Sequence, residues 1–194
     1  TVVRDDLVRA MAAREDLSFI SGDGSDATPK GLLNWTNATN KFNAAGVTLD
    51  NISSDLGKAM QKLMDAEIEL MGARCGWLIS PQTWKYLTTI RTTNGPWGFR
   101  DEMLGRGTLL GFPFRVTTQV PTTKIYFVGF ANAVIGEGLS LQVDASQEAA
   151  YHDGSAVVAS FSQDQTVIRV ISEHDFALRY DKSAAIIEAG TWGA

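Results

Sequence analysis

Apolar residues recur at helical spacing in the first part of the chain, whereas the second part is rich in candidate strands, the last of which have the β-branched content expected of strands. The opening segment predicts a helix over residues 2–20, because its apolar side chains fall near one face and charged residues occupy the others. That apolar face consists of Val3, Leu7, Ala10, Met11 and Leu17. The turn formers Gly22-Asp23-Gly24 then predict the end of the helix.

Two further helices are expected before the middle of the chain. Ser53 or Ser54 suits the N-cap of the first, over residues 53–72, and Gly72 suits its end. Ser80-Pro81 predicts the start of the second, over residues 81–91, because proline is favoured at the first helical position. Between them, Cys75–Ile79 has the apolar run of a buried strand. The methionines at positions 11, 60, 64 and 71 have helical spacing, which favours a place in the core.

The remaining segments favour loops and strands. Residues 34–52 are rich in Asn and Thr and are expected to form a loop with an edge strand, and residues 92–107 are expected to form a second loop. Strands are predicted at 113–119, 124–130, 133–136, 139–144, 156–162, 165–172 and 174–180. Because helices come first and strands follow, the pattern predicts an α+β fold and not regular βαβ units.

Composition and charge narrow the class of protein. The chain has 194 residues, of which 44% are hydrophobic, so it can bury a substantial core. The net charge of −5 does not favour tight binding of nucleic acid, which depends on many Lys and Arg contacts to phosphates. The single cysteine cannot form an internal disulfide, and no apolar run is long enough to span a membrane.

Candidate chemistry is weak throughout. Cys75 would be a nucleophile only if His152 or His174 could act as its base, and its place before Trp77-Leu78-Ile79 favours a packed side chain. Two histidines and one cysteine are too few for a structural zinc site. The glycine-rich segments lack the spacing of phosphate or dinucleotide loops, so no cofactor and no metal are expected.

The predicted loop at 92–107 carries the candidate contact residues. Trp97, Phe99 and Arg100 lie close together in it, and aromatic residues beside an arginine are typical of protein interfaces. The alternative is that the aromatic rings fold back onto the core, and the residues themselves leave both interpretations open. The chain is therefore an α+β protein without a convincing active site.

Several segments, taken in order along the chain, resemble the major capsid proteins of tailed bacteriophages, which have the Hong Kong 97-type fold. The resemblance covers nearly the whole chain and consists of Glu15–Gly24, Pro29–Leu33, Trp77–Pro81, Leu109–Val116, Val120-Pro121, Ile125–Phe130, Ala133–Glu137, Phe161–Arg169 and Asp175–Leu178. A departure is Val128-Gly129-Phe130, where the family usually has Gly-Asp. The resemblance also implies a C-terminal fragment that lacks the family's N-terminal arm and extended loop.

The resemblance implies a domain division and a function. Residues 1–33 and 138–173 would form a peripheral domain, with a spine helix on a long antiparallel sheet. Residues 34–137 and 174–194 would form an axial domain, with a central sheet flanked by helices. Copies of the chain would assemble into pentamers and hexamers of an icosahedral phage or prophage shell. The shell would enclose double-stranded DNA without binding it specifically and without a membrane. It would assemble in the bacterial cytoplasm and become part of the virion.

Three alternatives remain from the sequence. An encapsulin-type nanocompartment shell protein shares the fold but would enclose a cargo enzyme. A hydrolase that uses Cys75 would need an exposed, activated thiolate. A binding module would use the loop at 92–107 for a partner other than a second copy of the chain.

Overall fold

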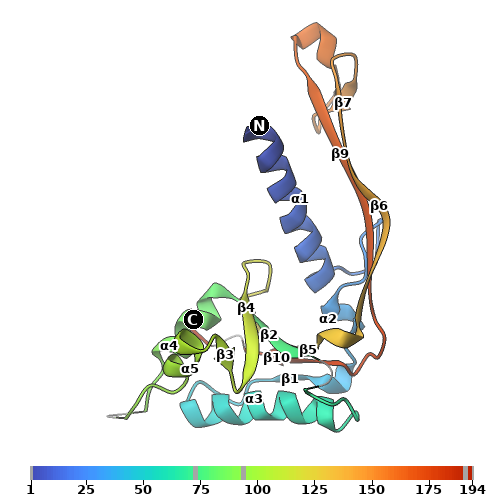
Figure 1. Ribbon diagram of the computed structural model, residues 1–194. Coiled ribbons are helices and arrows are strands. Elements are labelled where there is room, and N and C mark those ends of the chain that lie inside the picture. The colour runs from blue at the N-terminus through green and yellow to red at the C-terminus, as the bar shows by residue number, and fades with distance from the viewer. Residues whose placement is uncertain (1, 72–73, 93–94, 190–191, 194) are drawn as a thin grey trace. The chain divides into compact units, whose positions relative to one another are not determined.

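The computed structural model describes residues 2–71, 74–92, 95–189 and 192–193. Contacts within the chain divide it into two compact units. The smaller unit comprises Thr1–Val8 and Ile135–Asp175, and the larger unit comprises Arg9–Val134 and Phe176–Ala194. Helices and strands are both present, as expected for an α+β protein (Figure 1).

A six-stranded mixed sheet forms the centre of the larger unit, in the order β1-β10-β5-β2-β4-β3. Its strands are β1 (Lys41–Asn43), β2 (Cys75–Ile79), β3 (Thr108–Leu109), β4 (Phe112–Val116), β5 (Lys124–Gly129) and β10 (Ala184–Glu188). β1 pairs with β10 and β2 with β4 in parallel, whereas the pairs β10–β5, β2–β5 and β3–β4 are antiparallel. The edge position of β1 confirms the predicted edge strand.

The sheet is buried on both faces. Alternation sends Ile125 and Phe127 of β5 into one apolar cluster and Tyr126 and Val128 into another. β10 divides in the same way, with Ala185 and Ile187 on one side and Ala184 and Ile186 on the other. A strand buried on both faces reads as a continuous apolar run, which explains the sequence of both strands.

Helix α3 (Leu49–Met64) covers one face of the sheet through its apolar stripe. The buried members of the stripe are Ile52, Leu56, Ala59 and Leu63. The helix begins before the predicted Ser53 or Ser54: Thr48 is the N-cap, and its hydroxyl accepts a hydrogen bond from the Asn51 N–H at 3.3 Å. The helix ends at Met64, well before Gly72, which lies outside the described residues.

The methionine prediction is wrong at two positions. Met64 and Met71 are exposed, and Met60 packs against the core only in part. The helical spacing does not continue from Met64 to Met71, because α3 ends before Asp65. Beyond it, Glu67 has a positive φ of 59°, which changes the direction of the chain. The buried methionine is instead Met103, on a helix that the sequence pattern did not predict.

Apart from α1, the other helices of the larger unit are shorter than α3. They are α2 (Leu32–Trp35), α4 (Pro81–Thr89) and α5 (Arg100–Gly105), with the 3₁₀ turns η1 (Ala38–Asn40) and η2 (Phe130–Asn132). α4 starts as predicted, because the Ser80 hydroxyl accepts a hydrogen bond from the Thr83 N–H at 3.2 Å and Pro81 opens the helix. α5 lies inside the segment predicted to be a loop; its six residues are too few for helical periodicity to be recognised.

The long helix α1 (Val2–Ser21) ends at the predicted Gly22-Asp23-Gly24 turn. There the chain reverses, the Gly31 N–H donates to the Gly22 carbonyl at 2.8 Å, and the Asn34 side chain donates to the same carbonyl at 2.6 Å. A Cβ on Gly31 would lie 2.6 Å from the Gly22 nitrogen, so the two glycines allow this close approach of two backbones.

The smaller unit contains a long ribbon of β-structure, residues 135–175. It is built from β6 (Ala133–Ser146) and β9 (Val167–Leu178), which form a two-stranded sheet, and from the hairpin of β7 (Ala150–His152) and β8 (Val157–Ala159), followed by the 3₁₀ turn η3 (Ser160–Gln163). The strands predicted at 133–136 and 139–144 are one strand, and so are most of those predicted at 165–172 and 174–180. Gly136-Glu137-Gly138 runs through the ribbon as extended strand.

Candidate assembly surfaces

One face of the ribbon is richer in apolar side chains than the other. Gly138 lies against Glu173 and Gly136 against Asp175, so β6 and β9 run antiparallel and these pairs share the less apolar face. Arg169 and Asp144 form an ion pair at 3.1 Å on that face. Alternation then places Leu139, Leu141, Val143, Ile168 and Val170 on the opposite face, together with Glu137 and His174, whereas Val167 and Ile171 share the face of the ion pair.

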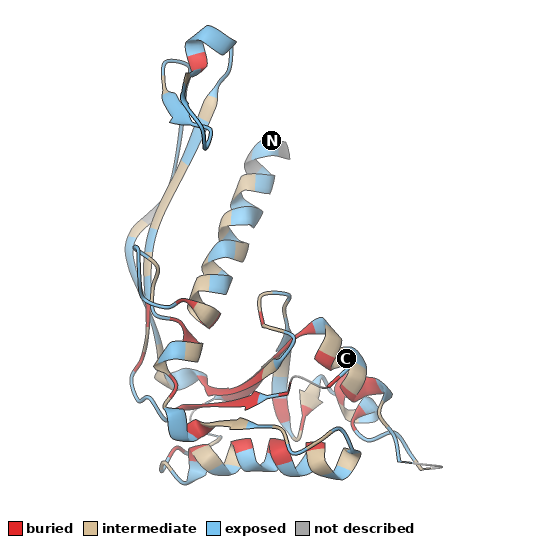
Figure 2. Ribbon diagram, turned by 180° about the vertical axis from the view of Figure 1, so that it is seen from behind, coloured by how far each residue is buried: buried red, intermediate tan, exposed pale blue. Residues whose placement is uncertain are grey.

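The ribbon has no apolar core of its own. Among the described residues from 135 to 175, Ser160 is the one that is buried, and Figure 2 shows the ribbon mostly in the colour of exposed residues. At the hairpin end, Val157 is 73% exposed and Phe161 is 82% exposed. An isolated two-stranded sheet is at best marginally stable in water, and exposed apolar area of this extent marks a surface that binds another protein surface.

The predicted contact residues divide between surface and core. Trp97 is 37% exposed, and the guanidinium groups of Arg91 and Arg100 lie 5.4 and 4.8 Å from its ring centroid. Phe99 is only 5% exposed and belongs to the core cluster beneath α3, so its side chain follows the alternative in which the ring folds back. We call Arg91, Trp97 and Arg100 the arginine clamp.

Backbone contacts hold the arginine clamp in place. Arg91 and Trp97 form an isolated antiparallel bridge, and the Gly98 N–H donates to the Ile90 carbonyl at 3.0 Å. A Cβ on Gly98 would collide with the side chain of Leu49, so the clamp lies at the start of α3. Arg91 and Arg100 form no ion pair within the part of the chain that the structure describes, which leaves both cations available to a partner.

A shallow apolar groove follows the other end of α3. Its volume is about 460 Å³, and it is lined by Met64, Ile68, Met71 and Phe112 together with the carboxylates of Glu67 and Glu69. Met71 is 78% exposed and Met64 is 51% exposed. The sequence did not predict this groove. The helix was expected to continue to Gly72, whereas it ends at Met64, and an end between Met64 and Met71 is the signal that could have revealed the groove.

The residues considered for catalysis belong to different units. Cys75 is buried in β2 of the larger unit, and burial raises the pKa of its thiol to about 11. Both histidines belong to the smaller unit: His152 is exposed, and His174 lies 3.9 Å from the Glu137 carboxylate. A thiol with this pKa is almost entirely protonated at neutral pH and is a poor nucleophile.

Across residues 2–71, 74–92, 95–189 and 192–193, the His, Cys, Asp and Glu side chains do not form a group of three or more that could hold a metal ion. Every helix in the same ranges is too short or too polar to cross a bilayer.

Residues 1–189 match the family model described as the phage capsid family. This chain belongs to the phage capsid family. Among curated proteins, it is 31% identical over 198 aligned positions to the major capsid protein of Klebsiella oxytoca phage phiKO2, covering 95% of this chain. The chain spans 45% of that relative's length.

The solved structures of capsids agree with the fold expected from the sequence. A capsid structure from Mycobacterium phage Bobi superposes with a TM-score of 0.72 at 16% identity, covering 97% of this chain and 65% of that chain. The holo-SrpI encapsulin complex from Synechococcus elongatus gives a TM-score of 0.56 at 16% identity, covering 96% and 65%. The Hong Kong 97-type α+β fold is thereby confirmed, and the phage capsid structure is more similar than the encapsulin.

Proposed function

We propose that the chain is the structural subunit of an icosahedral phage or prophage shell, in which copies assemble as pentamers and hexamers. One observation carries this proposal: the ribbon presents a face rich in exposed apolar side chains along β6 and β9, and its described residues between 135 and 175 form no buried apolar core. Such a face becomes stable when other surfaces cover it, and repeated copies of the same chain are the simplest source of those surfaces.

The two units then correspond to the peripheral and axial domains of a shell subunit. The peripheral domain comprises 1–33 and 138–173, and the axial domain comprises 34–137 and 174–194. The chain's departure at Val134 and return at Phe176 supports this division. Within α1, contacts group residues from Arg9 onward with the larger unit, so the exact boundary in that helix stays a prediction.

The arginine clamp is a contact between subunits in the assembled shell. Trp97 and Arg100 supply it, because tryptophan and arginine are the residues most enriched among energetically dominant interface positions. Phe99 contributes from beneath, since its buried ring anchors the start of α5.

The shell is a container and not an enzyme. The buried Cys75 thiol, whose pKa is raised to about 11, supports a role without catalysis. The shell encloses double-stranded DNA without specific recognition, in keeping with a subunit whose net charge is −5. Assembly takes place in the bacterial cytoplasm, and the product is the capsid of the virion.

The test is to express the complete protein that carries this sequence, measure its mass by light scattering and image it by negative-stain electron microscopy. Closed shells, or rings of five and six, are the expected result. A clean monomer over the concentration range in which shells form would refute the proposal. The same preparation of the complete protein serves as the reference for every variant described below.

An encapsulin-type compartment is the second candidate, because its fold is also similar. The greater similarity to phage capsids favours the phage shell. The two differ in what surrounds the gene: terminase and portal genes accompany a phage shell, and a gene for a cargo enzyme accompanies a compartment. A neighbouring cargo gene without terminase or portal genes would decide for the compartment.

A further inference from the structure

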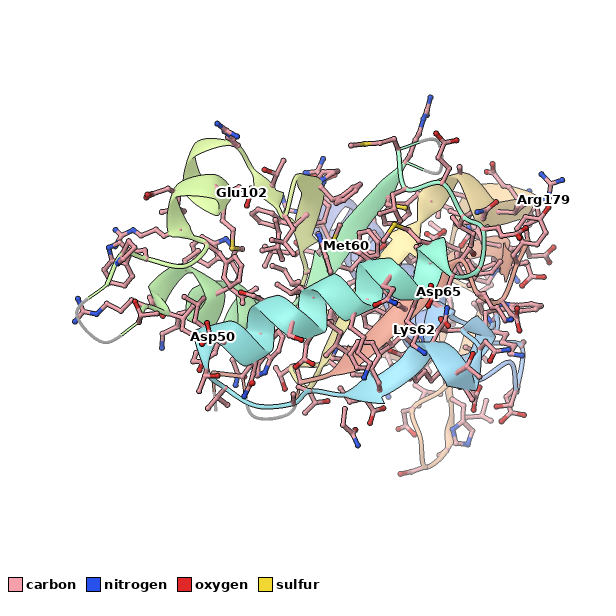
Figure 3. The ribbon with its side chains drawn as sticks, turned by 90° about the horizontal axis from the view of Figure 1, so that it is seen from below. Asp50, Met60, Lys62, Asp65, Glu102 and Arg179 are labelled. Atoms are coloured by element: carbon pink, nitrogen blue, oxygen red, sulfur yellow. The ribbon has the colours of Figure 1, made fainter. Side chains whose placement is uncertain are left out.

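Two complementary surface patches lie at opposite ends of α3. The arginine clamp lies beside Leu49, where the helix begins, and the methionine groove, lined by Met64, Ile68, Met71 and Phe112 between Glu67 and Glu69, lies where it ends. Figure 3 shows this helix lengthwise, with Asp50 near one end and Asp65 near the other, and Glu102 of α5 on the Asp50 side. Sixteen helical residues separate the two patches by about 24 Å.

The clamp is a partly exposed indole ring flanked by two cations. Its tryptophan ring is more than a third exposed, and a guanidinium lies within 6 Å of the ring centroid for each of two arginines. Neither arginine has an ion-pair partner among the described residues. The clamp therefore favours a recess that is apolar at its centre and negative at its rim.

The methionine groove has that character. Its lining combines Ile68 and Phe112, which are nearly buried, with the two exposed methionines. Thioether sulfur packs favourably against aromatic rings, and unbranched methionine adapts its shape to them. The carboxylates of Glu67 and Glu69 are exposed and form no ion pair within the described ranges.

We propose that the arginine clamp of one subunit docks into the methionine groove of the next, with Trp97 between Met64 and Met71 and the two arginines beside Glu67 and Glu69. This inference rests on the proposed function, since it names the partner of the clamp within a ring of subunits. The patches cannot meet within one chain, because both ends of one rigid helix separate them. A contact between unlike patches is head-to-tail, and repeated head-to-tail contacts close into rings when the rotation allows it.

Charge reversal tests the pairing in the complete protein. The double variant Arg91→Glu/Arg100→Glu makes the clamp negative, and Glu67→Arg/Glu69→Arg makes the groove positive. Each variant alone places like charges together, and we expect ring and shell formation to be lost or to need at least about tenfold more protein. Combining all four substitutions in one chain restores opposite charges at every contact, so assembly should recover.

Mixing the two double variants gives a sharper result. The negative clamp of the first variant fits the positive groove of the second, and the positive clamp of the second fits the negative groove of the first. Assembly then requires the two variants to alternate around the ring. Only even-numbered rings satisfy this condition, so hexamers should form and pentamers should be absent in mass measurements and class averages.

The controls separate failure of this inference from failure of the proposed function. Arg115→Glu changes an exposed arginine on β4 outside both patches and should leave assembly unchanged. Thermal melts of every variant should match the unaltered protein, because all four altered side chains are exposed. If the unaltered protein forms shells and both double variants assemble as well as it does, the docking is wrong and the shell function stands. If the unaltered protein forms no shells, the proposed function itself is wrong.

Discussion

Gly22 and Gly31 hold the end of α1 against the segment that follows it. A Cβ on Gly22 would collide with the carbonyl oxygens of Pro29 and Ser18, and backbone atoms cannot move aside as a flexible side chain can. We expect Gly22→Ala to lower the free energy of unfolding by about 1–3 kcal/mol, as overpacking of a close contact does. Urea unfolding followed by circular dichroism measures the change.

Gly57→Ala is the matched control for that substitution. Gly57 lies inside α3, and nothing lies within 4 Å of the place its Cβ would take. Alanine should therefore stabilise the helix by about 0.5–1 kcal/mol, because it has less backbone freedom to lose. Equal stability changes of the same sign in both variants would contradict the steric explanation.

Cys75 is the single thiol of the chain, and its reactivity reports on the core. Because burial raises the pKa to about 11 from the ordinary 9.0, the reactive thiolate is scarce at pH 7. Iodoacetamide should label the native protein much more slowly than the protein unfolded in urea. The native rate should still be rising between pH 9 and 10, where an ordinary thiol levels off; fast labelling at pH 7 would contradict a buried thiol.

At the scale of elements, α3 is capped by Thr48 and not by the predicted Ser53 or Ser54. Thr48→Ala removes the side-chain acceptor for the Asn51 N–H and should cost about 1 kcal/mol of stability. Ser54→Ala, at an interior and exposed position of the same helix, should be neutral or slightly stabilising. Thermal or urea unfolding compares the two variants, and a larger loss for Ser54→Ala would reverse the assignment.

Elements with strong local signals could be predicted from the sequence, and elements that depend on distant partners could not. α4 starts at Pro81 because the Ser80 hydroxyl accepts a hydrogen bond from the backbone N–H of Thr83, three residues away. This is a local effect that the sequence can reveal. β10 was missed because Ala184–Glu188 has no turn signal of its own and becomes a strand through pairing with β1 and β5. The methionine groove also depends on a distant partner, because one of its lining residues, Phe112, is far in sequence from Met64.

For the whole molecule, the order of weak motifs carried more information than any motif alone. The resemblance to phage capsids rested on segments from Glu15 to Leu178, and the family match over residues 1–189 confirms it. Which residues can contact another subunit, by contrast, depends on which side chains the fold leaves exposed. Phe99 and Trp97 are two residues apart, yet one is buried and the other exposed.

The acidic character of the subunit predicts weak adsorption of DNA. With a net charge of −5, the complete shell should bind double-stranded DNA with low affinity at physiological salt. Filter binding at two salt concentrations measures this property. Tight binding that weakens steeply as salt rises would show instead that a basic surface, formed on assembly, holds the genome.

The ribbon without a core has a consequence for the fate of free subunits. In the proposed shell, neighbours would cover the apolar side chains of the ribbon, so the stability of the ribbon would rise with subunit concentration by mass action. Before assembly the same segment is the part of the chain that opens most readily, since few buried contacts hold it. Host proteases should therefore cleave unassembled or misassembled copies faster than copies in finished shells. The open ribbon of the free subunit would then mark faulty copies for removal.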